Sequence, residues 1–311
     1  MIIKDAELVG IGPWLKFIWK GHITNWLWKD SQSRRLTRQH HYQEMKIGYF
    51  DKYIPFIKAL HSENKIQSDA DYQKEIIFSL WLQGIDNAPD IVQTCIASIK
   101  EIYGERLIVL DERSMYDYIN LPSYIIDKWK NKKIGAANFS DIVRIELLTQ
   151  YGGYWCDATD YMLRPIPEAI SDSDFFMYVT SPVFYTHMFV QTCFIRAKQG
   201  DALIKMWRDL VFEYWKNEEK SVDYFLVHLL FKMLVTYNPE AKALYEKMPK
   251  HYQDCLHELW FNYGNKPFNI NDYNDMKQKA FFQKCSYRKQ KYGIREIIPG
   301  SMAAHLFTKQ K

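Results

Sequence analysis

The chain has 311 residues, of which 47% are hydrophobic and 16% aromatic, and a formal net charge of +4. That length and composition suit one large α/β domain with helical additions and exclude a disordered chain. The charge is too small and too dispersed for a nucleic-acid-binding stripe, so we expect no nucleic-acid partner. Five scattered cysteines without a Cys-x-x-Cys pair exclude a disulfide framework or a structural zinc site and fit a reducing cytosol.

The N-terminal segment combines tryptophan with lysine. Four tryptophans lie between Leu8 and Trp28, among apolar residues and lysines. This composition is typical of an amphipathic helix in the lipid headgroup region, and equally of a helix packed on the domain's own surface or on another subunit. We expect no signal peptide, because the N-terminus is acidic early and lacks a small-residue cleavage site, and the sequence has no run of about 18 uncharged apolar residues. We predict a helical segment over residues 1–72 that is a candidate for membrane association, in a cytoplasmic protein peripheral to the inner face of the cell membrane.

The predicted catalytic core, residues 73–240, begins with a strand. E-I-I-F-S-L-W-L-Q-G is a continuous apolar run closed by Gly84, which is typical of a buried parallel strand. The next segment has Pro89 in its first turn and stops at Gly104, so it is predicted to be a helix. Residues 106–111 form the second strand. Strand, helix and strand together imply a right-handed crossover and an α/β layer fold.

The remaining elements of the core follow in order. We predict short helices at 114–120 and 122–131, a helix at 137–151, strands at 154–157, 175–180 and 190–195, and helices at 201–216 and 221–235. Gly152 and Gly153 end the third of these helices, and Ser221 is the expected N-cap of the last. Residues 241–311 are predicted to be a helical, basic region that completes the active site. Its basic run is either a solvated face or a surface for phosphates or anionic lipid.

Polar residues follow the strand at 154–157 directly. Asp157, Thr159 and Asp160 lie where an open α/β sheet binds its ligands, at the carboxyl end of a strand. Alternation along an extended chain places Asp157 and Thr159 on one side and Asp160 on the other. Carboxylates that share a divalent cation with phosphate oxygens would neutralise a leaving diphosphate. A capped turn is the structural alternative for these residues.

Five stretches carry a family resemblance. They are F-S-L-W-L-Q-G-I-D-N-A-P at 78–89, F-S-D-I-V-R-I-E-L-L at 139–148, G-G-Y-W-C-D-A-T at 152–159, R-P-I-P at 164–167 and E-Y-W-K-N-E-E-K-S-V-D-Y-F-L-V-H at 213–228. Over residues 75 to 240 the chain resembles bacterial capsular polysaccharide synthesis glycosyltransferases, relatives of α-mannosyltransferases and glucosylating toxins. The resemblance implies an A-type glycosyltransferase fold, a Rossmann-like mixed sheet flanked by helices with N-terminal and C-terminal helical additions.

The resemblance also implies roles for individual residues. Asp157 corresponds to the first acid of the D-x-D element, and Thr159 stands where the second acid is usual. Asp160 is the carboxylate that could replace it, and His305 falls where such enzymes place a C-terminal ligand of metal or diphosphate. His305 is otherwise an ordinary surface or core histidine.

Two further pairs are assigned to the donor. Asp141 and Arg144 resemble the pair that binds the donor sugar hydroxyls and the diphosphate, with a helix-face salt bridge as the alternative. Trp81 and Gln83, at the end of the first strand, are placed to meet the nucleotide base, although Trp81 also suits the core.

Asp223 is the candidate on the acceptor side. On a continuous helix it diverges from His228, five positions later, by more than 100 degrees, so the two should not face one pocket. In an inverting enzyme Asp223 would be the general base, and otherwise it is a first-turn acid favoured by the helix dipole. The resemblance favours retention, for which no such base is required.

These inferences converge on one function. We predict a Mn²⁺- or Mg²⁺-dependent, retaining transferase that moves galactose or glucose from a UDP-sugar to a polyprenyl diphosphate-linked saccharide in capsule or exopolysaccharide synthesis. The competing hypothesis is a non-catalytic, membrane-peripheral scaffold of a polysaccharide assembly complex. A phosphohydrolase that uses Asp157 and Asp160 is disfavoured, because no second acidic or histidine cluster supplies another metal site.

Overall fold

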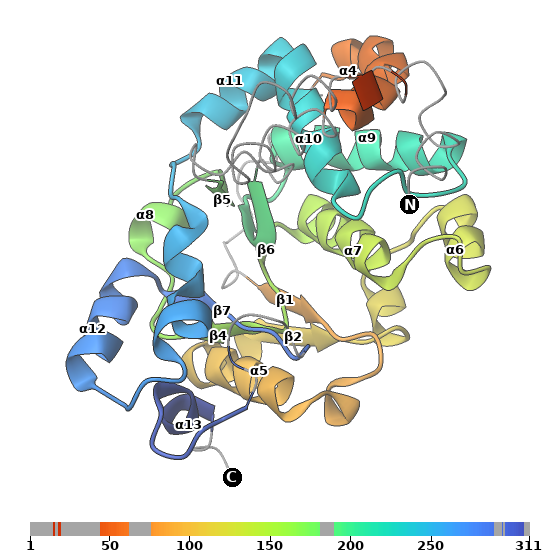
Figure 1. The fold of residues 1–311 in the computed structure, drawn as a ribbon. Coiled ribbons are helices and arrows are strands. Elements are labelled where there is room, and N and C mark those ends of the chain that lie inside the picture. The colour runs from red at the N-terminus through yellow and green to blue at the C-terminus, as the bar shows by residue number, and fades with distance from the viewer. Residues whose placement is uncertain are drawn as a thin grey trace.

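The computed structural model describes residues 44–61, 76–180, 190–288, 294 and 296–307, together with Leu15, Ile18 and Trp19 (Figure 1). Most of the predicted interfacial segment between Leu8 and Trp28 therefore lies outside the described residues. In the described part of the chain, no helix is both long and apolar enough to cross a bilayer. The division at residues 72 and 240 stays a prediction.

A five-stranded mixed sheet forms the centre of the molecule. Its strands are β1 (Ile77–Leu80), β2 (Leu107–Leu110), β3 (Gly153–Cys156), β5 (Phe175–Val179) and β6 (Val190–Ala197), in the order β2-β1-β3-β6-β5. β1 is parallel to both of its neighbours, whereas β6 is antiparallel to β3 and to β5. All four residues of β1 are buried, as expected of a central parallel strand covered on both faces. The mixed α/β architecture predicted from the sequence is confirmed.

A second, two-stranded sheet lies beside the first. It pairs β4 (Asp160–Met162) with β7 (Phe282–Lys284) in antiparallel register, and Lys284 lies opposite Asp160. The sequence does not predict these short strands, because the pairing joins segments more than a hundred residues apart. The pairing brings the C-terminal region to the carboxyl end of β3.

Helices cover both faces of the large sheet (Figure 1). One face carries α5 (Asp90–Tyr103), and the other carries α7 (Ala136–Tyr151), α9 (Ala202–Asn217) and α10 (Leu226–Tyr237). The strands alternate between two apolar clusters, since Tyr154 and Cys156 belong to the cluster on the α5 side and Trp155 to the cluster on the α7 side. The next residue on the α7 side of β3 is Asp157.

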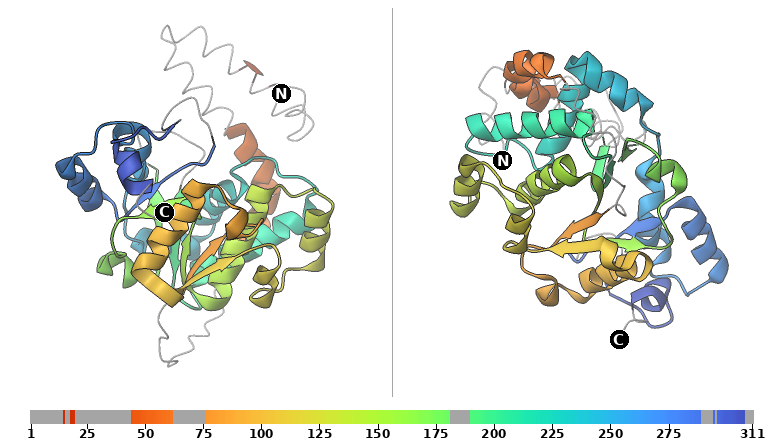
Figure 2. Two further views of the ribbon diagram at one scale, coloured as in Figure 1. Left: turned by 90° about the horizontal axis from the view of Figure 1, so that it is seen from below. Right: turned by 180° about the vertical axis from the view of Figure 1, so that it is seen from behind.

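Shorter elements complete the described chain. They are η1 (Phe50–Tyr53), α4 (Ile54–Ala59), η2 (Ile85–Asn87), η3 (Gly104–Arg106), η4 (Ser114–Asp117), α6 (Ser123–Lys130), α8 (Glu168–Ser171), α11 (Pro239–Lys247), η5 (Gln253–His257), η6 (Leu259–Tyr263), α12 (Ile270–Lys279) and α13 (Met302–Phe307). α4 packs against α10, whereas α12 and α13 lie on the side of the sheet that α5 covers (Figures 1 and 2). Helices from both ends of the chain therefore flank the core.

The two-glycine turn links α7 to β3 without a spacer. Gly152 and Gly153 have φ values of 66° and 86°, which non-glycine residues rarely adopt. A Cβ atom at Gly153 would also collide with the carbonyl oxygen of Ile76. The turn fixes the position of Asp157, just beyond β3, relative to Arg144 on α7.

The predicted N-cap at Ser221 is wrong. The helix begins at Leu226, and its N-cap is Phe225. The Asp223 carboxylate accepts a hydrogen bond from the backbone N–H of Phe225 at 2.7 Å and pairs with Lys46, so residues before the helix form a loop. Polar side chains of this type compete with helix formation by bonding nearby backbone groups.

Candidate active site

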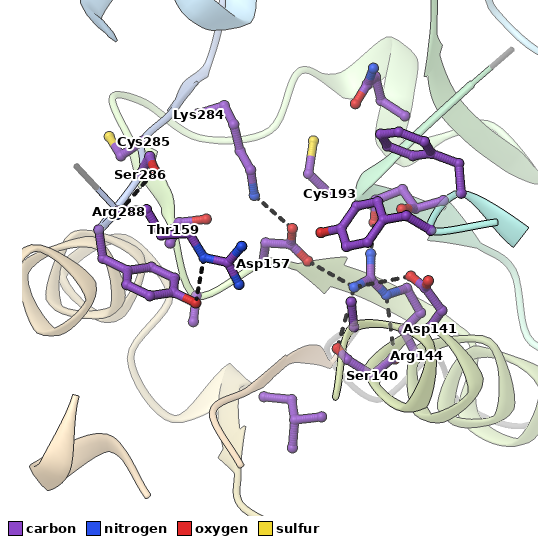
Figure 3. Close-up of a pocket in the computed structure, with 18 of the residues that line it drawn as sticks. Ser140, Asp141, Arg144, Asp157, Thr159, Cys193, Lys284, Cys285, Ser286 and Arg288 are labelled. Atoms are coloured by element: carbon purple, nitrogen blue, oxygen red, sulfur yellow. Dashed lines mark hydrogen bonds and ion pairs between the residues drawn. The ribbon is translucent and has the colours of Figure 1, made fainter. Parts of the chain in front are cut away.

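A cavity of about 440 Å³ opens at the carboxyl ends of β1 and β3. Its lining comes from the end of β1, from α7, from the residues after β3, from β6, from residues 224–228 and from the C-terminal region. Because β1 and β3 are parallel, residues that follow them meet at one edge of the sheet. Figure 3 shows Asp157 near the middle of this cavity, between Lys284 and Arg144.

Asp157 is held by three side chains. Its Oδ1 atom accepts a hydrogen bond from Trp155 Nε1 at 2.8 Å and lies 3.3 Å from Arg144 Nη2. Its Oδ2 atom is 2.6 Å from Lys284 Nζ. Burial acts to raise the pKa of Asp157, but the charges of Lys284 and Arg144 outweigh it and hold the pKa below its ordinary value. The group is therefore an anion at neutral pH.

Arg144 joins three elements of the core. Its Nη1 atom donates to the carbonyl oxygen of Thr192 on β6 at 2.6 Å, and Nη2 lies 3.3 Å from Asp141 on its own helix. The guanidinium also lies over the Trp155 ring, 4.8 Å from its centroid. Burial raises the pKa of Asp141 to about 6, although Arg144 opposes that effect. The predicted pair of Asp141 and Arg144 is thus both a helix-face ion pair and part of the cavity wall.

Asp160 is not part of the cavity lining. Its side chain is fully buried, and its Oδ2 atom accepts from the backbone N–H of Asp157 at 3.2 Å. Lys284 Nζ lies 3.1 Å from its other oxygen. Thr159, by contrast, lines the cavity together with Asp157 and Ala158. The chain is not extended here, because residues 157–160 form a turn in which the backbone N–H of Asp160 donates to the carbonyl oxygen of Asp157 at 2.9 Å. Burial raises the pKa of Asp160 to about 7, against the effect of Lys284.

The end of β1 contributes one of its two predicted residues. Trp81 lines the cavity and meets Tyr287 edge to face, with ring centroids 5.2 Å apart. The buried indole N–H groups of Trp81 and Trp260, both in the lining, have no acceptor among the described residues. Gln83 is exposed and is not part of the lining. The cavity wall therefore includes aromatic surface, but not the predicted glutamine amide.

Two other predicted residues lie outside the lining. His305 is on α13 and stacks on Phe268, with ring centroids 3.7 Å apart. Asp223 points toward Lys46 and the start of α10, as described above. His228 lines the cavity instead, with Nε2 3.4 Å from the Thr192 hydroxyl. The two residues do not share the cavity, because Asp223 lies in the loop before α10 and not on the same helix as His228.

The C-terminal region supplies cavity residues that sequence reasoning missed. Lys284 and Arg288 are the cationic ones, and His257 lies nearby. Burial, with a smaller effect from Lys284, lowers the pKa of His257 to about 4, so this ring is neutral at neutral pH. The basic run after Lys277 was the only signal in the sequence, and it does not distinguish these residues from a solvated face.

The contacts of Asp157 and Asp160 bear on the metal site that the sequence predicts. No three His, Cys, Asp or Glu side chains in the described part of the chain form a group that could hold a metal ion. Both oxygens of Asp157 are engaged by cationic or N–H groups, and Asp160 is fully buried outside the cavity lining. A divalent ion needs open carboxylate oxygens and is repelled by an ammonium group at the same place. In this arrangement the residues do not fit a divalent ion, and Mn²⁺ or Mg²⁺ binding stays a prediction.

Residues 25–305 match the family model described as capsular polysaccharide synthesis protein. The chain belongs to this family. The matched range includes every described residue of the cavity, from Leu80 to Arg288. A search of curated proteins found no match. Membership of this family indicates a role for the chain in capsule biosynthesis.

Proposed function

We propose that this capsular polysaccharide synthesis protein is a retaining glycosyltransferase of the A-type fold that moves galactose or glucose from a UDP-sugar to a lipid-linked saccharide. The observation that carries the proposal is the cluster of Arg144, Asp157 and Lys284 at the carboxyl end of β3, inside a cavity of about 440 Å³. Cavities of this size suit a small-molecule ligand held by a few convergent polar groups. Membership of the capsule family supports a sugar as part of that ligand.

The donor would lie across this cluster. Trp81 and Tyr287 would offer aromatic surface to the uracil ring. Arg144, Lys284 and Arg288 offer N–H donors to the diphosphate. Because Arg144 and Lys284 are already fixed by ion pairs, they would stabilise the charge that develops on the leaving diphosphate with little rearrangement.

The transfer step exchanges one bond to the sugar for another. The bond between the anomeric carbon and the diphosphate oxygen breaks, and the acceptor hydroxyl oxygen bonds to the same face of that carbon. The acceptor proton passes to the leaving diphosphate oxygen, so no protein base is needed. This route agrees with the position of Asp223, whose carboxylate bonds to Lys46 and to the start of α10 outside the cavity lining. Asp141 would accept a hydrogen bond from a donor hydroxyl.

The acceptor side has an aromatic character. Tyr224 and Phe261 line the cavity and are 63% and 53% exposed, so their rings are open to a ligand. We propose that they contact the terminal sugar of a polyprenyl diphosphate-linked acceptor. Attachment to the inner face of the cell membrane through the segment between Leu8 and Trp28 would bring the enzyme to that lipid. Deletion of residues 1–40 should then reduce recovery with liposomes and transfer to lipid acceptors, but not hydrolysis of the donor.

The direct test is the release of UDP from a panel of UDP-hexoses by the purified protein with lipid-linked saccharide. Asp157→Asn removes the anion that holds Arg144 and Lys284 and should lower the rate by about a hundredfold or more, as loss of one preorganised group does in other enzymes. Lys198→Met, which breaks an exposed ion pair with Asp174, is the matched control. Binding to liposomes without UDP release from any donor would instead favour the scaffold.

A further inference from the structure

Lys284 bridges two carboxylates at the floor of the cavity. Its Nζ atom lies 2.6 Å from Asp157 Oδ2 and 3.1 Å from Asp160 Oδ1. The position is set by the backbone, because β7 pairs with β4 and places Lys284 directly opposite Asp160. Only 22% of the lysine side chain is exposed, so the ammonium group is held in one place rather than extended into solvent.

Lys284 lies where a divalent metal ion would otherwise be expected. Two carboxylates three residues apart, one of them fully buried, repel each other unless a cation lies between them. In many phosphate-binding sites that cation is a divalent metal ion. Here Lys284 already occupies the space between Asp157 and Asp160. A divalent ion could bind both carboxylates only after the lysine had left.

Lys284 can still act on a ligand. An ammonium group has three N–H donors, and one of them is hydrogen-bonded to Asp157 Oδ2, whereas Asp160 Oδ1 is an ion-pair partner at 3.1 Å. Lys284 is part of the cavity lining, together with the guanidinium of Arg288. Arg288 is exposed, its Nε atom lies 3.4 Å from the Tyr287 hydroxyl, and no carboxylate pairs with it among the described residues. Figure 3 shows this guanidinium on the Thr159 side of Asp157.

We propose that Lys284 is a built-in cation that takes the place of a divalent metal ion, and that it binds the donor diphosphate together with Arg144 and Arg288. The inference rests on the proposed function, because it assumes that a nucleotide diphosphate enters this cavity. This role of Lys284 leads to a different expectation from that of a metal-dependent enzyme. Donor binding should not need Mn²⁺ or Mg²⁺.

Titration calorimetry with UDP tests the proposal, in excess EDTA and again in excess Mn²⁺. The wild-type protein should bind UDP with about the same affinity in both buffers, within roughly twofold. Lys284→Met should weaken UDP binding in EDTA by about tenfold or more, since a charge-assisted hydrogen bond is lost. Lys284→Arg should lose less. The control is Lys279→Met, which breaks a lysine–aspartate pair of the same 2.6 Å length on the exposed face of α12 and should bind UDP as the wild type does.

A double variant shows whether a loss of UDP binding comes from misfolding. Lys284→Met leaves Asp160 buried beside Asp157 without its cation, so it is compared with the double variant Lys284→Met, Asp160→Asn, which removes one charge of each sign. Far-ultraviolet circular dichroism establishes that each variant is folded, and the double variant should show the same loss of UDP affinity.

The results of these titrations distinguish a failure of the proposed role of Lys284 from a failure of the proposed glycosyltransferase function. Wild-type binding of UDP only in Mn²⁺ would overturn the role of Lys284 and leave the proposed glycosyltransferase intact. Folded variants that bind UDP in EDTA as well as the wild type would also overturn it. Absence of UDP binding by the wild type in either buffer would overturn the proposed function, and the inference with it.

Discussion

Replacement of Arg144 by methionine should destabilise the fold more than almost any other single change in the cavity. The substitution removes the cation beside Asp141, whose side chain is 9% exposed, and the donor to the Thr192 carbonyl oxygen at 2.6 Å. Asp157 remains paired with Lys284, so its charge is destabilised less than that of Asp141. Removal of one partner from a buried ion pair costs about 3–5 kcal/mol, so we expect a loss of about 4 kcal/mol in the free energy of unfolding.

Urea denaturation at pH 8 measures this loss. Burial raises the pKa of Asp141 to about 6, so at a lower pH protonation would relieve the unpaired charge and mask part of the effect. The double variant Arg144→Met, Asp141→Asn should recover about half of the loss, because a neutral amide replaces the unpaired anion. Lys198→Met, at an exposed ion pair, should change stability by less than about 0.5 kcal/mol. A loss below about 1 kcal/mol for Arg144→Met would refute the buried network described here.

Three further outcomes are expected. Gly153→Ala should lower the free energy of unfolding, measured by urea denaturation, by at least about 1 kcal/mol more than Gly104→Ala does. Both glycines have positive φ, but only at Gly153 would a Cβ atom collide with backbone. Equal losses of unfolding free energy in the two variants would contradict the tight turn. Folding lowers the pKa of His257 from 6.5 to about 4, so the unfolded chain binds more protons at this site and the contribution of His257 to stability falls as the pH is lowered from 6.5 to 4. The free energy of unfolding of the wild type minus that of His257→Gln should therefore decrease over this window, and a difference that does not change with pH would contradict the burial of His257. Tyr224→Ser should raise the KM for the lipid-linked acceptor without changing the KM for the UDP-sugar, whereas Tyr252→Ser, at an exposed ring outside the cavity lining, should change neither.

Local signals in the sequence predicted much of the core. The apolar run before Gly84 became β1, the segment from Ala137 to Tyr151 became α7, and the glycine pair ended that helix as expected. The approach of Arg144 to Asp157 follows from the same segment, because a helix, a tight turn and a strand leave little freedom between them. Periodicity and turn chemistry suffice where the determining contacts are close in sequence.

The rest of the site depends on distant contacts. Lys284 pairs with Asp157 across 127 positions, and no periodic pattern predicts the pairing of β4 with β7. Asp223 was misplaced for a different reason, since the prediction started the helix at Ser221 while the side chain bonds the backbone of the loop instead. Side-chain direction in a loop depends on tertiary partners such as Lys46, which sequence spacing does not reveal.

A crystal structure of the protein with UDP tests the central claim most directly. We predict that the diphosphate oxygens lie within hydrogen-bonding distance of Arg144 and Lys284, with the uracil ring against Trp81. UDP bound elsewhere on the molecule, or a cavity that stays empty at saturating UDP, would contradict the account.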